Sequence, residues 1–233
     1  CVQIPTTIVS QVDSSVGGKT GVNTPEGKNL LGAFHQPQLV LADVDTLSSL
    51  PEREFNEGFA EIIKHAAIRD ESLLKLVEQR DQIRDHLISL VSRNVLIKAN
   101  IVEEDERETT GIRALLNFGH TIGHGIEAAG GYGRFLHGEA ISLGLVAAIR
   151  LSSANSSLTV EEGDRLIACL EQYGLPIKLP DDISDEAILI SLQRDKKFED
   201  GQIRFVLLNQ TSQAFVSSDI TTEQIARAIA CLR

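Results

Sequence analysis

The sequence predicts a mainly α-helical domain over residues 51–233, preceded by a segment of strands and turns over residues 1–50. The first 50 residues are rich in Gly, Pro, Thr, Val and Asn and show little helical periodicity. After Pro51, apolar residues recur at three- and four-residue spacing, which is typical of helices. With 233 residues, 42% hydrophobic and 24% charged, the chain is long and apolar enough to bury a core, so its composition excludes wholesale disorder.

Local patterns predict each element in turn. The segment Val16–Asn23 is typical of a tight turn, and the apolar run Leu39–Val44 predicts a buried strand. Pro51 suits the first turn of a helix, where the missing N–H would have had no partner. Apolar spacing predicts helices over 52–69, 70–80, 83–103, 115–129, 137–154, 160–173, 184–194 and 221–232, and alternation predicts a hairpin of 202–208 with 213–217.

The charge balance argues against two classes of partner. Asp plus Glu number 33 and Lys plus Arg number 22, which gives a formal net charge of −11. Such an acidic surface repels nucleic acids and anionic membranes. No apolar run approaches the roughly 20 residues of a membrane-spanning helix. We therefore expect neither a nucleic-acid partner nor a membrane partner.

The cysteines and the start of the chain indicate its compartment and origin. Cys1, Cys169 and Cys231 are odd in number and widely spaced, which favours reduced thiols over a disulfide framework. With no recognisable signal peptide, we expect a cytoplasmic protein. The sequence contains no Met and begins at Cys1, so we expect a processed chain or a fragment.

The segment Asn117–His124 is the strongest local signal for chemistry. His120 and His124 are four residues apart, so they share one helix face, and this spacing serves to bind a divalent metal or to pair a ligand with a base. Two hydrogen-bonded histidines in a packed core remain an equal alternative. Glycines at 119, 123 and 125 each cost roughly 1 kcal/mol relative to Ala, so we expect a close approach to this backbone.

Two further residues extend this signal. His137 follows a glycine-rich loop and is a candidate ligand from a second element, with a helix-capping role as the alternative. Glu61 lies among apolar residues, where a carboxylate needs a partner or a metal. Lys64, three residues later, offers a surface ion pair as the other explanation. One acid and two histidines would form a three-ligand zinc site with an open position.

Basic residues beside glycines and polar breaks indicate anion recognition. The stretch Gly17–Gly21 lacks the spacing of a phosphate-binding loop, so it does not predict a nucleotide triphosphatase. In an acidic protein, cations placed in turns suit a phosphate or a carboxylate, although each alone is also consistent with a solvated surface charge. These cations are Lys19, Lys28, Lys98, Arg113 and the pair Lys196 and Lys197.

Several longer strings resemble the 3-dehydroquinate synthases, a family within the sugar-phosphate cyclases. The strings are Gln3–Thr7, Gln11–Asn23, Gly27–Asn29, Leu47–Glu54, Ala60–Lys64, Arg113–His124, His137–Ala140 and Asp195–Lys197. The resemblance implies that residues 51–233 form the helical metal- and substrate-binding domain of this fold. It also implies that residues 1–50 are the end of an α/β NAD-binding domain, most of which is missing.

The resemblance also implies an activity. Members convert 3-deoxy-D-arabino-heptulosonate 7-phosphate to 3-dehydroquinate and phosphate, in the shikimate pathway of aromatic amino acid biosynthesis. The implied cofactors are NAD and zinc or cobalt, the implied partner is a small sugar phosphate, and the full-length enzyme is expected to be a homodimer. Without most of the NAD-binding half, we expect the isolated chain to turn over poorly.

Residue roles follow from the matched motifs. The implied metal ligands are Glu61, His120 and His137, so His124 is an active-site base rather than a ligand. Further catalytic positions are Lys64, Arg113 and Asn117. The substrate-binding positions are Lys19, Lys28, Asn29, Lys98 and Lys197, with Lys196 as an alternative to Lys197. The cofactor-binding positions are Thr6, Thr7, Asp13, Lys19 and Lys28.

Three other functions remain open at this point. Another sugar-phosphate cyclase would share the framework but take a different substrate, such as sedoheptulose 7-phosphate. A metal-dependent alcohol dehydrogenase of the glycerol dehydrogenase type would produce NADH, whereas a cyclase regenerates its cofactor. A non-catalytic metal-binding module would bind zinc but no substrate.

Overall fold

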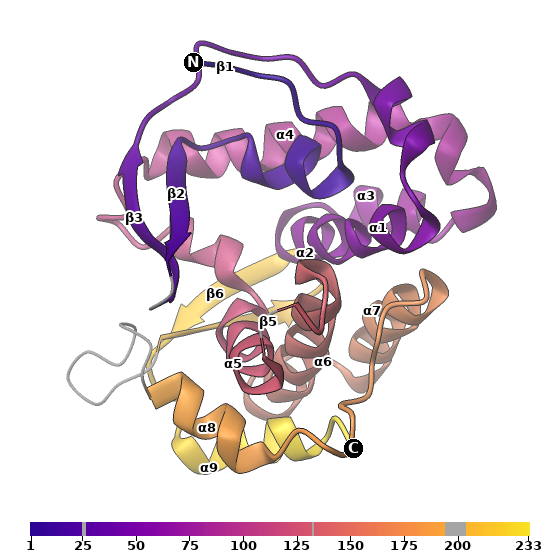
Figure 1. Cartoon of the computed structure of the whole chain (residues 1–233). Helices are drawn as coiled ribbons and strands as arrows, with labels where there is room; N and C mark the ends of the chain where they lie inside the picture. Colours follow the sequence, from indigo (N-terminus) through magenta and orange to yellow (C-terminus); the bar gives the residue numbers. More distant parts are fainter. Residues whose placement is uncertain (25–26, 132, 194–203) are drawn as a thin grey trace.

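The computed structural model describes residues 1–24, 27–131, 133–193 and 204–233, except the side chains at 23, 27–30 and 193. Helices dominate this part of the chain, as predicted (Figure 1). Strands and short helices of the first 50 residues lie on one side of the central helix α2, and the helices after residue 119 lie on the other side. None of the described helices is long and apolar enough to cross a membrane.

The first 50 residues form two small sheets and two short helices. β1 (Val2–Gln3) pairs in parallel with β4 (Leu39–Val40), and β2 (Lys19–Thr24) pairs antiparallel with β3 (Gly27–Phe34). A single π-helical turn, η1 (Ser10–Ser14), precedes the hairpin, and the 3₁₀ helix η2 (Val44–Ser49) follows it. The predicted turn is confined to Gly17 and Gly18, whose φ angles of 97° and 68° suit glycine, because the chain is already a strand from Lys19.

The prediction of a buried strand over Leu39–Val44 is wrong. Only Leu39 and Val40 form a strand, and both Leu39 and Leu41 are 54% exposed. Within the described residues β4 pairs only with β1, in a two-stranded sheet, and Val40 is only partly buried. An apolar run identifies residues that can be buried, but burial itself requires a neighbouring layer.

The predicted helix over 52–69 is divided at Gly58 into α1 (Glu52–Glu57) and α2 (Phe59–Arg69). A Cβ atom at Gly58 would lie 2.4 Å from the Ile8 side chain, so this joint packs directly against the N-terminal segment. α3 (Glu71–Val77) is capped by Asp70, whose side chain accepts from the Leu73 N–H. A 3₁₀ helix, η3 (Arg80–His86), then leads into α4 (Leu87–Glu104).

α2 is the central helix of the fold. Every residue from Phe59 to Ile68 is buried, because α2 packs against α4, α6, α7, η1 and β6. A helix enclosed on all sides is apolar around its whole circumference, and this one is so except for Glu61, Lys64 and His65. These three polar side chains are therefore held inside the protein.

The C-terminal part contains the remaining predicted helices and the hairpin, with bounds shifted by a few residues. Its helices are η4 (Arg113–Asn117), α5 (His120–Gly130), α6 (His137–Asn155), α7 (Val160–Gln172), α8 (Asp185–Gln193) and α9 (Thr222–Ala230). The hairpin pairs β5 (Phe205–Gln210) with β6 (Gln213–Ser217). Thr159 and Thr221 cap α7 and α9, since each side chain accepts an N–H two or three residues inside its helix.

Glycines allow the first half of α5 to pack closely against α6. The helix predicted over 115–129 begins only at His120, because Gly119 has a φ of 77° and separates η4 from α5. A Cβ atom at Gly144 would lie 2.1 Å from the Gly119 carbonyl oxygen, and one at Gly123 would lie 3.0 Å from the Ala140 carbonyl oxygen. The close approach expected at Gly119 and Gly123 is therefore made by α6, and the one expected at Gly125 is made by α8.

Candidate metal centre and its surroundings

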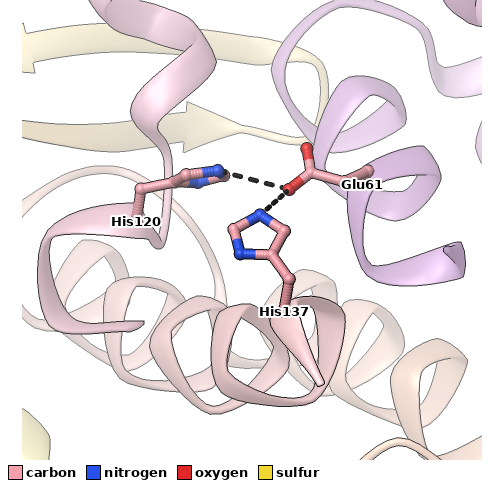
Figure 2. Close-up of side chains that lie close together, drawn as sticks. All are labelled: Glu61, His120 and His137. Carbon is pink, nitrogen blue, oxygen red and sulfur yellow. Dashed lines mark ion pairs between the residues drawn. The ribbon is translucent and has the colours of Figure 1, made fainter. Parts of the chain in front are cut away.

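Glu61, His120 and His137 converge from three helices. The Oε1 atom of Glu61 lies 3.2 Å from Nε2 of His120 and 3.3 Å from Nε2 of His137 (Figure 2). Glu61 comes from α2, while His120 and His137 are the first residues of α5 and α6. The Glu61 side chain is fully buried, and that of His137 is 34% exposed, so the group opens to solvent on the His137 side.

This donor set fits a divalent metal. In a tetrahedral site with metal–ligand distances of about 2.0–2.1 Å, ligand atoms lie about 3.3 Å apart, close to both observed separations. Oε1 of Glu61 is buried and forms no hydrogen bond within the described part of the chain. One carboxylate and two imidazoles are typical of a zinc site that keeps a position open for water or substrate.

The surroundings of His120 orient its ring for this task. Nδ1 of His120 lies 3.2 Å from the Phe118 carbonyl oxygen, to which it donates in the neutral ring. Nε2 then carries the lone pair that faces Glu61. Burial lowers the pKa of His120, and Glu61 only partly offsets this, so the neutral ring needed for metal binding is favoured.

The second oxygen of Glu61 pairs with Lys64. Nζ of Lys64 donates to Oε2, and both side chains are almost completely buried. Burial alone would raise the pKa of Glu61, but Lys64 and His120 hold it well below its usual value. Burial alone would lower the pKa of Lys64, but Glu61 and Asp13 raise it. One oxygen of Glu61 therefore faces the imidazoles, and the other forms an ion pair with Lys64 that lies in the interior, so the alternative of a surface ion pair is wrong.

Asp13 extends this ion pair toward α4. Its Oδ1 lies 2.8 Å from Nζ of Lys98 and 3.8 Å from Nζ of Lys64, and its carbonyl oxygen accepts from Lys98. Burial would raise the pKa of Asp13, but the two ammonium groups hold it far below its usual range. The placement of Lys98 in a turn is wrong, because Lys98 lies in the middle of α4 and reaches η1 from there.

His65 and Asn94 also belong to this network, although the sequence analysis did not identify them. Nδ1 of His65 lies 3.0 Å from Oδ1 of Asn94, and Nε2 of His65 lies 3.7 Å from Oδ1 of Asp13. His65 follows Lys64 directly, so the polar pair inside an apolar helix was the available signal. Asp13, Glu61 and His65 also place three donor atoms within 4.8 Å of one another, but the ammonium of Lys64 disfavours a second cation there.

Arg113 is buried between the N-terminal hairpin and the loop after α4. Its Nη2 donates to the Gly17 carbonyl oxygen at 2.6 Å, and its Nη1 donates to the Glu106 carbonyl oxygen at 2.7 Å. Glu108, a third residue that the sequence did not point to, pairs its Oε1 with Lys19 and lies 3.8 Å from Nε of Arg113. Glu108 ends a run of mostly acidic residues over 103–108. Such runs usually face solvent, so the sequence did not mark Glu108 as a site residue.

Asp105 organises the loop that carries Glu108 and Arg113. Its carboxylate accepts from the backbone N–H groups of Thr109, Thr110, Gly111 and Arg113 at 2.7–3.2 Å. Burial would raise the pKa of Asp105, but these hydrogen bonds lower it from 3.8 to about 2.

A pH-dependent loss of stability is expected from Asp105. A carboxyl group with a lowered pKa stabilises the folded chain fully above the unfolded pKa and loses this effect as the pH falls through the folded value. The difference in unfolding free energy between the unmodified chain and Asp105→Asn should stay constant down to about pH 4 and shrink toward pH 2. Urea unfolding across this range measures it, and a constant difference throughout would contradict the assignment.

The other predicted site residues are distributed around this core. His124 is exposed, with its ring centroid 5.4 Å from that of His120 and 6.1 Å from that of His137. Asn117 lines a small gap among α5, α6 and β5 together with Thr121. Thr7 binds Ser10 at the start of η1, next to the exposed Thr6.

Three predicted positions lie wholly or partly outside the described residues. Lys28 and Asn29 belong to β3 by their backbone, but their side chains are outside the described part. Lys197, with its alternative Lys196, also lies outside the described residues.

Family models match both parts of the sequence. The model "3-dehydroquinate synthase C-terminal" matches residues 58–198, and the model "3-dehydroquinate synthase N-terminal" matches residues 1–57. A 3-dehydroquinate synthase from Thermodesulfovibrio yellowstonii is 46% identical over 233 residues, which is 98% of this chain and 65% of that protein. One from Prochlorococcus marinus is 43% identical and covers 98% and 63%. The chain thus spans less than two thirds of the length of these curated relatives.

Solved structures agree on the fold. A 2-epi-5-epi-valiolone synthase from Streptomyces hygroscopicus, determined with NAD⁺ and Zn²⁺, has a TM-score of 0.90 at 29% identity, covering 99% of this chain and 65% of that one. A 2-deoxy-scyllo-inosose synthase, determined with carbaglucose-6-phosphate, NAD⁺ and Co²⁺, has a TM-score of 0.87 at 24% identity, covering 100% and 66%. With a family model matching more than half of its residues, this chain belongs to the 3-dehydroquinate synthase family.

Proposed function

We propose that this chain supplies the metal centre and much of the substrate site of a 3-dehydroquinate synthase. The reaction would convert 3-deoxy-D-arabino-heptulosonate 7-phosphate to 3-dehydroquinate and phosphate, with NAD and zinc or cobalt as cofactors. The convergence of Glu61 with His120 and His137 supports this most strongly, because it unites residues from three segments in a metal-binding geometry. A cytoplasmic homodimer and a domain boundary near residue 50 are part of the same proposal.

Each part of the site has a distinct proposed task. Glu61, His120 and His137 would hold the metal and leave a coordination position open on the exposed side of His137. When bound, a divalent ion there would act as a Lewis acid and lower the pKa of nearby hydroxyl groups. His124, exposed beside the two histidine ligands, would move protons near neutral pH as the active-site base.

The cations would recognise the anionic groups of the substrate. Lys64 and Lys98 both face Asp13, which helps to raise the pKa of Lys64 and partly offsets the lowering of the pKa of Lys98 by burial. Arg113 is already fixed by two carbonyl groups. A fixed guanidinium loses little conformational entropy when it binds a phosphate or a carboxylate. We assign to the substrate Lys19, Lys28, Asn29, Lys64, Lys98, Arg113, Asn117 and Lys197, and to NAD Thr6, Thr7, Asp13, Lys19 and Lys28.

Ligand binding by the purified chain tests the proposed function. With zinc present, 3-deoxy-D-arabino-heptulosonate 7-phosphate at about 100 times its dissociation constant should stabilise the chain by about 2.7 kcal/mol, since it binds only the folded state. Urea unfolding with and without this ligand measures the gain. The gain should disappear when a chelator removes zinc.

Two comparisons give this test its specificity. Sedoheptulose 7-phosphate at equal concentration should stabilise the chain much less, and preferential binding of it would assign the chain to another sugar-phosphate cyclase. Glycerol with NAD should yield no NADH. Zinc binding without stabilisation by either sugar phosphate would leave only a metal-binding module and would contradict the proposal.

A further inference from the structure

The first turn of α6 is capped by a residue of another helix. The residue before α6 is Leu136, whose side chain has no acceptor for the free N–H groups of the first turn. Instead, Oε2 of Glu57, at the end of α1, accepts from the Gly138 N–H at 2.7 Å. The capped turn begins with His137, so this hydrogen bond lies next to a proposed metal ligand.

Two more contacts hold α1 against the same turn. Arg53 donates from Nε and Nη2 to the two carboxylate oxygens of Glu139, at 2.6 and 2.8 Å. Glu139 in turn accepts from the Leu136 N–H at 2.8 Å, which closes the turn from inside. A Cβ atom at Gly138 would lie 1.9 Å from the Glu57 carbonyl oxygen, so only glycine permits the observed approach. α1 therefore contacts the first turn of α6 through both its backbone and its side chains.

The four-residue spacing of three charged residues connects these contacts between α1 and α6 to the metal centre. Arg53, Glu57 and Glu61 are four residues apart, so they follow one face of α1 and α2 across the joint at Gly58. Glu57 reaches the start of α6, and Glu61 reaches the imidazole of His137 one turn further along. The same stretch of chain thus delivers a metal ligand and an anchor for a second metal ligand.

We propose that Glu57 is a positioning residue for the metal centre, which sets the distance between Glu61 and His137 by tying the first turn of α6 to the end of α1. This inference rests on the proposed metal site. Outer groups that orient metal ligands typically change metal affinity by about 10–100-fold. The hydrogen bond of Glu57 goes to the Gly138 N–H, so this effect is expected to pass through the helix turn that carries His137.

Zinc and cobalt binding by the full 233-residue chain test the role of Glu57. Competition with a chromophoric chelator should show about 10-fold weaker zinc binding for Glu57→Ala, with an altered visible spectrum of the bound Co²⁺. The control is Glu52→Ala on the same helix, because the ion pairs of Glu52 among the described residues are with Arg80 and Arg84 of η3. Glu52→Ala should bind zinc like the unmodified chain.

A double variant separates positioning from simple helix capping. In Glu57→Ala with Leu136→Ser, a serine next to the turn can cap α6 by itself, so stability should recover while zinc affinity stays low. Recovery of both would reduce Glu57 to a cap and overturn the proposal, as would unchanged affinity in Glu57→Ala.

Further outcomes keep the two proposals distinguishable. If Glu57→Ala does not fold, Glu57→Asp provides the comparison, because its shorter reach should still weaken zinc binding several-fold, and unchanged affinity would overturn the role of Glu57. Failure of the unmodified chain to bind zinc would instead contradict the metal site itself.

Discussion

Glu61→Gln is expected to remove zinc binding and to destabilise the chain at the same time. The change removes the only carboxylate among the three proposed ligands, so the affinity should fall more than the roughly 100-fold upper range for an outer group. It also leaves the buried ammonium of Lys64 without the carboxylate to which it donates. Breaking a buried ion pair from one side costs about 3–5 kcal/mol, so we expect a loss of about 3 kcal/mol in unfolding free energy.

Chelator competition and urea unfolding measure the two effects separately. The matched control is Glu71→Gln, because Glu71 forms ion pairs near the surface with Lys75 at 3.3 Å and with Arg165 at 3.7 Å. Each pair should contribute no more than about 1 kcal/mol, and zinc affinity should not change. Zinc binding by Glu61→Gln at the unmodified affinity would refute the ligand assignment.

Gly144→Ala should produce a comparably large loss of stability by separating α5 from α6. The added Cβ atom would lie 2.1 Å from the Gly119 carbonyl oxygen and 2.6 Å from the Gly123 nitrogen, and backbone atoms cannot turn aside as a side chain can. Overpacking of this kind costs about 3 kcal/mol, and the helix propensity of Ala returns only about 1 kcal/mol of it. Since His120 and His137 begin these two helices, zinc affinity should fall as well.

Gly163→Ala is the control for this prediction. Gly163 also lies inside a helix, but its nearest neighbours are side-chain atoms of Ile149 and Ser153 at 3.0 and 3.1 Å, which can shift. Its unfolding free energy should change by about 1 kcal/mol or less. If Gly144→Ala unfolds at the same urea concentration as the unmodified chain, the close contact between the two helices is not as tight as the structure indicates.

Most helices could be predicted because the buried face of a helix produces apolar residues at three- and four-residue spacing in the sequence. α6, predicted over 137–154, spans His137–Asn155, and α7 and α9 end within a few residues of their predictions. The strand prediction over Leu39–Val44 failed because apolar residues state a capacity for burial, whereas the covering layer comes from elsewhere in the chain. The split at Gly58 was equally hidden, since it depends on Ile8, about 50 residues away.

The site likewise contains residues that the sequence identified and contacts that it did not. The residues alone identified Glu61 as an acid in apolar surroundings and marked His120, His124 and His137 as possible ligands. Which two histidines face Glu61 was left to the family resemblance, because a four-residue spacing places His120 and His124 on one face equally well. The networks of Asp13 with Lys98 and of Arg113 with Gly17 link segments about 85 and 96 residues apart, which no local pattern records.

From the order of amino acids alone we derive a helical protein with a buried acid and a small set of histidines and cations suited to a metal and an anion. The folded structure was needed to show that His120 and His137 both turn Nε2 toward the same oxygen of Glu61, while Lys64 pairs with the other. The reason is physical: side-chain periodicity reports which face of a helix is buried, but the meeting of three helix ends depends on glycine contacts and on a cap supplied from another helix.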